Sequence, residues 1–309
     1  MALPDGSHIA DSGYVYFSLR DSKNTFHCTS CYRQINAEEL INKDESVSRT
    51  FVQKAVVVMS KLPLYGEVRA KLQPTTEAYF AQRNFRDTQI LQDLFESSNQ
   101  LGRQSIKDIS QFSTGLNLEQ VFRLPAHGVL TLLKAILLEG RIVVYSHISS
   151  RVSSFIYSVI ALLPGCSFFT ADSSLAVQKS LRFLKQFGLP LHVFASEPCD
   201  STEPVSSKGI ALYPFFALPN VDKLDRDKGF LLGTTNQLFL NFPRIKADLV
   251  VDLDKFTVQT MTEIRQAQQM KSASSAISAE AQEFQKLIKT HTSYEKKAFK
   301  VANLEPKRP

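Results

Sequence analysis

Residues 127–194 read HGVLTLLKAILLEGRIVVYSHISSRVSSFIYSVIALLPGCSFFTADSSLAVQKSLRFLKQFGLPLHVF, and helical and strand-like patterns alternate along this stretch. Between residues 129 and 138 the apolar side chains recur at helical spacing, and Gly140 follows where a C-terminal glycine is expected. The next run, residues 142–145, is apolar at every position, which is typical of a strand covered on both faces. The stretch therefore predicts the centre of an α/β domain.

The segments after residue 145 continue the alternation. Ser149 or Ser150 is placed to cap a second helix, and Pro164-Gly165 would end it. Its apolar stripe comprises Val152, Phe155, Ile156, Val159, Ile160 and Leu163. Strands are predicted over residues 166–170 and 191–194, with a helix between them that ends at Gly188. Strands joined by helices of this length lie parallel with right-handed crossovers.

The first hundred residues show a different pattern. Residues 14–19, 25–33 and 54–60 are rich in aromatic and β-branched side chains, as strands are. Residues 65–83 have a helical pattern, and Pro74 within them predicts a kink or two shorter helices. The helical pattern continues over residues 87–98. An antiparallel sheet backed by helices is therefore expected ahead of the α/β part.

Composition excludes several classes of protein. The chain has 309 residues, a formal charge of +6 and 43% hydrophobic residues, which is ordinary for a soluble globular protein. No aromatic-studded basic patch supports nucleic-acid binding. The first residues carry no secretory signal, and no apolar stretch is long enough to cross a bilayer. Four cysteines predict reduced thiols in the cytosol.

Several separated motifs resemble one family. The run LLKAILLEGRIVVYS followed by ALLPG resembles the central module of DENN-domain proteins. Three more motifs, SCYRQI (residues 30–35), KLPLYG (61–66) and GFLLGTTNQLF (229–239), are similar to the late-secretory-pathway, or Avl-nine, branch of that superfamily. The resemblance covers residues 1–255 in the family's order.

The resemblance implies a domain organisation. Residues 1–98 would form a longin-like N-terminal lobe, and residues 115–255 the central DENN lobe. Residues 256–309 would form a helical, partly disordered tail that ends in a basic cluster. Relatives carry an opening strand before the ALPDG corner, whereas this chain begins at Met1. If the chain is complete, the N-terminal lobe should have an unpaired strand edge. The guanine-nucleotide exchange on a small GTPase that the resemblance implies should then be slow.

No constellation for covalent chemistry is visible. Cys28 and Cys31 have the spacing of half a zinc site, but no second pair exists, so they are expected to be packed thiols that bind no metal. No P-loop and no G-x-S-x-G elbow occurs. His147 is interpreted as a loop histidine bonded to the backbone. No catalytic residue and no cofactor is expected.

Two stretches are candidate partner-binding sites. Lys61, Pro63 and Tyr65 lie where a strand leaves the sheet and a helix begins, and they are either buried packing or part of a protein-binding surface. Thr235 and Asn236 follow Gly233, which is expected to allow a tight bend, and they either bond the local backbone or contribute to binding. All five are candidate contacts to a GTPase.

The resemblance implies a regulator of vesicle trafficking that binds a Rab-family small GTPase and promotes GDP release. A trafficking scaffold without exchange activity is the alternative, and a metabolic α/β enzyme is a third interpretation. The protein is expected in the cytoplasm, associated peripherally with endomembranes or secretory vesicles, with its basic tail touching an anionic membrane surface.

Overall fold

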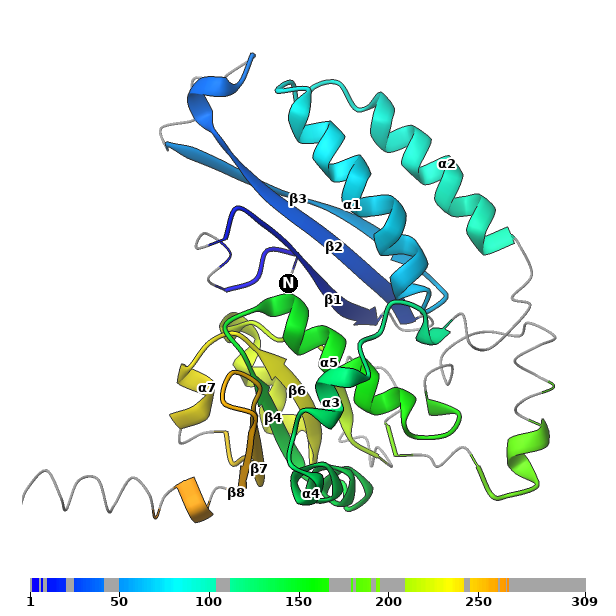
Figure 1. Cartoon of the computed structure of the whole chain (residues 1–309), viewed down its shortest axis with the longest axis vertical. Coiled ribbons are helices and arrows are strands. Elements are labelled where there is room, and N and C mark those ends of the chain that lie inside the picture. Colours follow the sequence, from blue (N-terminus) through cyan, green and yellow to red (C-terminus); the bar gives the residue numbers. More distant parts are fainter. Residues whose placement is uncertain are drawn as a thin grey trace, which may run out of the picture. The chain divides into compact units, whose positions relative to one another are not determined.

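The computed structural model describes residues 2–5, 7, 10–20, 25–41, 50–103, 112–166, 179, 182–189, 193–194, 209–241, 245–260, 262–264 and 266. Residues 1–259 form one compact unit and residues 260–309 a second. The first unit contains a three-stranded sheet and a five-stranded sheet (Figure 1). The α/β class predicted from the sequence is thereby confirmed.

The first sheet is antiparallel. It comprises β1 (Ser12–Arg20), β2 (Thr25–Asn36) and β3 (Phe51–Ser60), in that order. Tyr16 lies opposite Thr29, and Ser30 lies opposite Val57. A short 3-10 turn, η2 (Ala37–Glu39), follows β2. All three strands match those predicted from the aromatic and β-branched runs.

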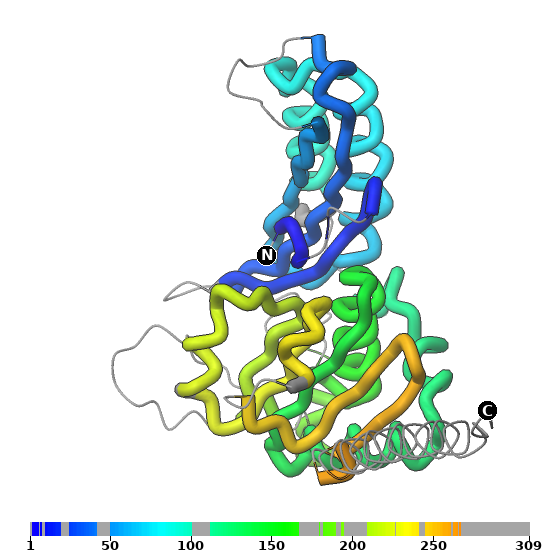
Figure 2. Tube along the Cα trace, turned by 90° about the vertical axis from the view of Figure 1, so that its left-hand side faces the viewer, coloured from blue at the N-terminus to red at the C-terminus, as the bar shows by residue number. Residues whose placement is uncertain are grey.

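Two helices lie along one side of this sheet, α1 (Tyr65–Ala81) and α2 (Gln89–Arg103) (Figure 2). Of the two alternatives predicted for Pro74, a kink or two shorter helices, the second is wrong, since α1 is a single helix with Pro74 inside it. Proline removes one backbone hydrogen bond, but Leu72 and Phe80 anchor the helix through buried side chains on either side of it. On α2, Leu94 is buried, whereas Phe95 is 67% exposed.

The second sheet has the order β5-β6-β4-β7-β8. Its strands are β4 (Arg141–Tyr145), β5 (Ala211–Tyr213), β6 (Phe230–Thr234), β7 (Leu249–Asp252) and β8 (Thr257–Thr260). The β4·β6, β4·β7 and β5·β6 pairs are parallel. The apolar run of β4 therefore lies at the middle of the sheet, and Val144 is fully buried, as its pattern predicts.

Helix α5 (Ser149–Ala161) lies between the two sheets, and every side chain from Val152 to Ile160 is buried. On one side it packs over β6, where Gly233 leaves no space for a side chain, because a Cβ there would lie 2.4 Å from Val152 Cγ1. Gly233 therefore serves close packing inside a strand, and not a bend after it. On the other side α5 packs against β1.

Short elements complete the unit. They are α3 (Glu119–Phe122), α4 (Ala126–Leu137), η5 (Leu218–Arg226) and α7 (Leu238–Asn241). At the end of α4 the left-handed residue is Glu139, with φ of 57°, and not the predicted Gly140. Gly140 instead donates its backbone N–H to the Ala135 carbonyl, 2.9 Å away.

Two further expectations need correction. Neither Ser149 nor Ser150 caps α5, because the helix begins at Ser149 without a side-chain cap, and the Ser149 hydroxyl donates to the Tyr14 carbonyl of β1 instead. The tail predicted to be helical from residue 256 begins with strand β8, which follows β7 in the sheet. The predicted strand at 166–170 and most of the tail lie outside the described residues.

Candidate functional site at the ends of the central strands

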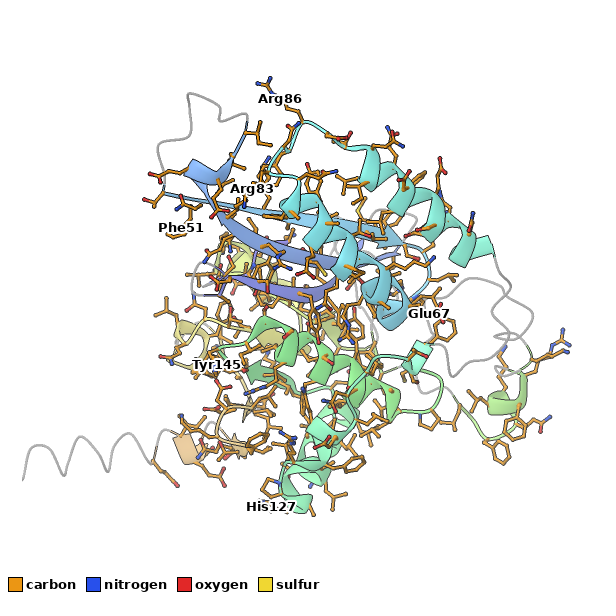
Figure 3. The ribbon with its side chains drawn as sticks, turned by 45° about the horizontal axis from the view of Figure 1, so that its top comes forward. Phe51, Glu67, Arg83, Arg86, His127 and Tyr145 are labelled. Atoms are coloured by element: carbon orange, nitrogen blue, oxygen red, sulfur yellow. The ribbon has the colours of Figure 1, made fainter. Side chains whose placement is uncertain are left out.

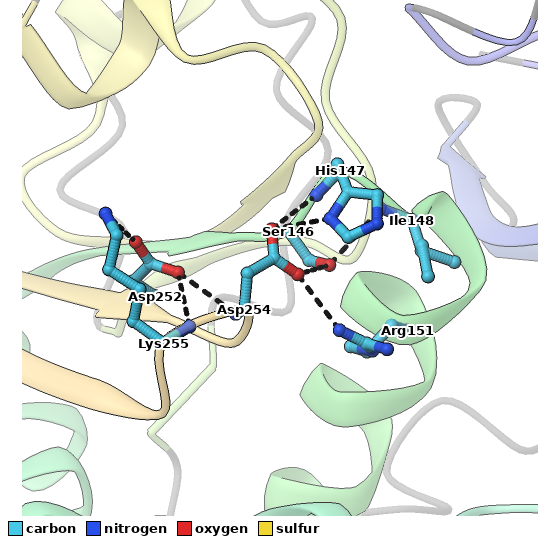
Figure 4. Close-up of polar contacts among 7 residues, drawn as sticks. All are labelled: Ser146, His147, Ile148, Arg151, Asp252, Asp254 and Lys255. Atoms are coloured by element: carbon cyan, nitrogen blue, oxygen red, sulfur yellow. Dashed lines mark hydrogen bonds and ion pairs between the residues drawn. The ribbon is translucent and has the colours of Figure 1, made fainter. Parts of the chain in front are cut away.

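A cluster of charged and polar side chains lies at the carboxyl ends of β4 and β7 (Figure 4). Ser146 and His147 follow β4, Arg151 lies in the first turn of α5, and Asp254 follows β7. The carboxyl ends of neighbouring parallel strands meet at one edge of a sheet, which is where α/β proteins commonly bind ligands. This edge is therefore where a ligand site or a catalytic group would be expected.

Asp254 is the centre of this cluster. Its carboxylate accepts hydrogen bonds from the Ser146 hydroxyl at 2.6 Å and from the His147 backbone N–H at 2.9 Å. The same group pairs with His147 Nδ1 at 2.8 Å and with Arg151 at 3.0 Å. Partial burial alone would raise the pKa of Asp254, but the hydrogen bonds from Ser146 and His147 outweigh it and lower the pKa.

The arrangement does not suit nucleophilic catalysis. The Ser146 hydroxyl donates to the Asp254 carboxylate, whereas a catalytic serine donates to an imidazole, and Ser146 is fully buried. The interpretation of His147 as a histidine bonded to backbone is corrected, since its ring pairs with a carboxylate. Asp254 thus ties the loop before α5 to the turn after β7, and the cluster holds the start of α5 in place.

Replacement of Asp254 by asparagine should cost about 2 kcal/mol of unfolding free energy at neutral pH, since hydrogen bonds to a charged group are lost. The pKa of this carboxyl is lowered in the folded state, so its stabilising effect is present above the unfolded pKa. The effect is lost as the pH falls through the folded pKa. Urea unfolding of the parent protein and of Asp254→Asn should show that the difference between their unfolding free energies becomes smaller as the pH is lowered from 7 to 3.

Lys255→Ala supplies the matched control. Lys255 pairs with Asp252 at 2.9 Å, but the lysine side chain is 76% exposed. Exposed pairs contribute little, so this variant should lose only about 0.3 kcal/mol. Equal losses in the two variants, or a difference that stays constant with pH, would contradict the role given to Asp254.

The predicted binding residues of the KLPLYG motif divide into two groups. Lys61 is exposed, whereas Pro63 and Tyr65 are buried. The Tyr65 hydroxyl is 2.7 Å from His27 Nδ1, and its ring centroid is 4.1 Å from that of Tyr157 on α5. Burial and, second, Tyr157 raise the pKa of Tyr65 well above its ordinary value. Pro63 and Tyr65 thus follow the buried-packing alternative, and Tyr65 joins α1 to α5.

Thr235 and Asn236 lie after β6 and are half-buried. The Asn236 side chain accepts from the Leu238 backbone N–H at 3.0 Å, which is the local bonding that the sequence predicts. The Thr235 hydroxyl instead donates to the carbonyl of Asp5 at 2.8 Å. Ser30 of β2 likewise donates to the Ala2 carbonyl at 2.8 Å. Residues 2–5 therefore connect the two sheets.

Sequence reasoning missed the serines of α5. The Ser153 hydroxyl accepts from the Tyr16 backbone N–H at 3.1 Å, and it donates to the Ser149 carbonyl at 3.1 Å. A backbone N–H at the edge of β1 thereby finds its hydrogen-bond partner in a helix side chain. The sequence pattern that could have indicated this role is the presence of serines four residues apart on an otherwise apolar helix.

Cys28 and Cys31 lie on β2 and cannot share a metal ion. Cys28 packs with Val15 and Phe17, whereas Cys31 packs with Leu72. Residues three apart on a strand point to opposite faces. Burial raises the pKa of Cys28 to about 11 and that of Cys31 to about 12, so both are neutral thiols. Within the described part of the chain, no group of three or more metal-ligating side chains occurs.

Purified protein should accordingly contain no stoichiometric zinc. A metal analysis by mass spectrometry, before and after dialysis against a chelator, tests this. About one zinc per chain that disappears in the Cys28→Ser variant would overturn the assignment.

Comparisons with known proteins point in one direction. A family model described as "Transport protein Avl9" matches residues 1–298. The late secretory pathway protein AVL9 of Saccharomyces cerevisiae is 28% identical over 302 residues, which cover 84% of this chain and 38% of that protein. Its Schizosaccharomyces pombe counterpart is 30% identical over 279 residues, which cover 84% of this chain and 56% of that protein.

The chain thus spans about half the length of the curated relatives that it matches. No helix in the described segments has the length and apolar character needed to span a membrane. The family match extends over both sheets and the α5 helix between them. By this match, the chain belongs to the Avl9 family of transport proteins.

Proposed function

We propose that this protein acts in vesicle transport of the late secretory pathway, as a DENN-type regulator that binds a Rab-family small GTPase and promotes GDP release. The observation that supports the proposal most is the Avl9 family match over residues 1–298, together with the names of both yeast relatives. The N-terminal sheet and its helices would be the longin-like lobe, and the five-stranded sheet the central DENN lobe.

The proposed mechanism requires no covalent step. A protein that binds the nucleotide-free form of a GTPase better than its GDP-bound form accelerates GDP release through that difference in affinity. Such a role needs a firmly held surface. The ring contact between Tyr65 and Tyr157 and the bond from Tyr16 to Ser153 hold the two sheets of the unit together. The Asp254 cluster holds the start of α5.

The candidate contact residues then act in different ways. Lys61, Thr235 and Asn236 reach the surface and could touch the GTPase directly. Pro63 and Tyr65 are buried and would act by positioning α1. Peripheral attachment to an anionic membrane through the basic residues near the C-terminus belongs to the same proposal.

Release of fluorescent GDP from a panel of Rab proteins tests the proposal. We expect measurable acceleration with one cognate Rab, and Lys61→Glu should reduce it several-fold, because a charge on the contact surface is reversed. Lys255→Glu is the matched control, since Lys255 is also exposed but lies in the turn after β7.

Each outcome of the panel has a meaning. A Rab that binds without faster GDP release would favour the alternative, a non-catalytic trafficking scaffold. Binding to none of the panel, by protein that unfolds cooperatively, would overturn the proposal of a Rab partner.

A further inference from the structure

The outer edge of β3 combines features that rarely occur together. β3 is the last strand of its sheet, and among the described residues it pairs only with β2. Residues 55–59 read AVVVM, apolar at five successive positions. Such a run is typical of a strand covered on both faces, whereas exposed edge strands usually carry charges or proline.

Side chains on both faces of β3 are partly covered, and no residue of the strand is fully buried. Val56 and Val58 pack against Leu72 and Leu94 on the helix side. Val57 packs on the opposite face, against a cluster that includes Phe17 and Phe215. At the two ends of the strand, Phe51 is 55% exposed and Met59 is 61% exposed, and Figure 3 shows Phe51 near the start of the strand.

A groove of about 770 Å³ follows this edge. One wall is β3 from Lys54 to Ser60, and the opposite wall is the face of α2 that carries Leu91, Phe95 and Asn99. The lining is largely apolar, and its only charged side chains are Lys54, where the β3 wall begins, and Lys61, which directly follows the last residue of β3. They are seven residues apart, which corresponds to about 23 Å of extended chain.

We propose that this groove is a docking site for an extended segment of a partner protein, which adds a strand to the edge of β3. The segment has apolar residues at alternate positions and an acidic residue at each end. Backbone hydrogen bonds to β3 supply affinity, and alternate side chains enter the groove toward Phe95. The two lysines select the acidic ends.

The charge pattern argues against a second copy of this chain as the occupant. In the antiparallel register that pairs residues 54–61 with themselves, Lys54 of one copy lies opposite Lys61 of the other. Like charges directly opposite each other on neighbouring strands are destabilising. This strand-binding role rests on β3, α2 and Lys61. It shares Lys61 with the proposed Rab contacts but requires no GTPase.

The test uses labelled eight-residue peptides and the full chain, followed by fluorescence anisotropy. The first peptide has glutamate at both ends with valine and threonine alternating between them. The second has lysine at both ends, and the third has proline at two central positions. We expect the acidic peptide to bind and the proline peptide to bind at least ten-fold more weakly, since proline cannot donate to a strand.

Variants locate the site. Phe95→Ala should weaken the acidic peptide several-fold, whereas Phe122→Ala should not, because Phe122 on α3 is similarly exposed, at 66%, but lies outside the groove. The double variant Lys54→Glu with Lys61→Glu should reverse the preference, so that the lysine-ended peptide binds better. Hydrogen exchange of residues 55–59 should slow when the acidic peptide is present.

Three results would overturn the proposal. One is equal binding of the acidic and proline peptides, and another is unchanged exchange of β3 with bound peptide. The third is the finding that, in a longer form of the protein, the β3 amides are protected from exchange without peptide and the acidic peptide does not bind. A strand of the same chain would then occupy the edge of β3. None of these measurements involves a GTPase, so the strand-binding and Rab proposals can fail separately.

Discussion

Replacement of Val159 by aspartate should lower the free energy of unfolding by roughly 4 kcal/mol at neutral pH, because an unpaired carboxylate would enter a dry site. Val159 is 1% exposed in the middle of α5 and belongs to the main hydrophobic cluster. Because α5 packs against both sheets, the loss should affect the whole first unit. Urea unfolding followed by circular dichroism measures it.

The pH dependence of the unfolding free energy shows whether the buried charge causes the loss of stability in Val159→Asp. Burial raises the pKa of the introduced carboxyl in the folded state above its unfolded value near 3.9. Protonation therefore favours the folded variant, and its deficit should shrink as the pH falls from 7 toward 4. Val159→Ala, which only removes apolar contacts, should lose about 2 kcal/mol at every pH. An unchanged melting temperature in Val159→Asp would show that the core is assigned wrongly.

Gly66→Ala should be a strongly damaging single-methyl change. Gly66 is the second residue of α1, and a Cβ there would lie 2.1 Å from the carbonyl oxygen of Thr114 and 2.9 Å from Gly115 Cα. Both neighbours are backbone atoms, which cannot move aside as a side chain can. We expect a loss of about 3 kcal/mol, measured by urea unfolding, as α1 separates from residues 114–115.

Gly188→Ala is a suitable comparison for this variant. Gly188 has φ of +71°, so alanine there is strained, but its Cβ would meet no atom within 4 Å. Strain of this kind costs about 1 kcal/mol. If Gly66→Ala were no more harmful than Gly188→Ala, the close approach of α1 to residues 114–115 would not be a feature of the folded protein. A near-ultraviolet signal from Tyr65 and Tyr157 should also change only in Gly66→Ala.

Much of the fold could be predicted because its patterns are local. The apolar run of β4 and the stripe on α5 identified the buried centre, and Val144 and Val159 are buried as expected. The mistakes arose where a distant segment decides the outcome. Ser149 resembles a helix cap in sequence, yet its hydroxyl bonds to Tyr14, 135 residues away.

The candidate site was harder to predict for the same reason. From the sequence, Pro63 and Tyr65 could be either buried packing or part of a binding surface. Both are buried, and Tyr65 contacts Tyr157 of α5, nearly a hundred residues later. Asp254 was not singled out, since its partners Ser146 and Arg151 lie more than a hundred residues earlier. Sequence spacing carries no information about such pairs until the order of the strands is known.

The bond between Tyr16 and Ser153 has a consequence for synthesis on the ribosome, because 137 positions separate the two residues. At typical elongation rates of about 5–20 residues per second, Ser153 is made roughly 7–27 seconds after Tyr16. During that interval the nascent β1–β2 hairpin can form, but the edge of β1 that α5 later covers is open. The opposite edge, on β3, is completed within the same interval and is open as well. The nascent chain should therefore be a client of chaperones that shield unpaired strands until α5 has been made and covers β1. Ribosome profiling of chaperone-bound chains would show engagement ending soon after residue 161 leaves the exit tunnel.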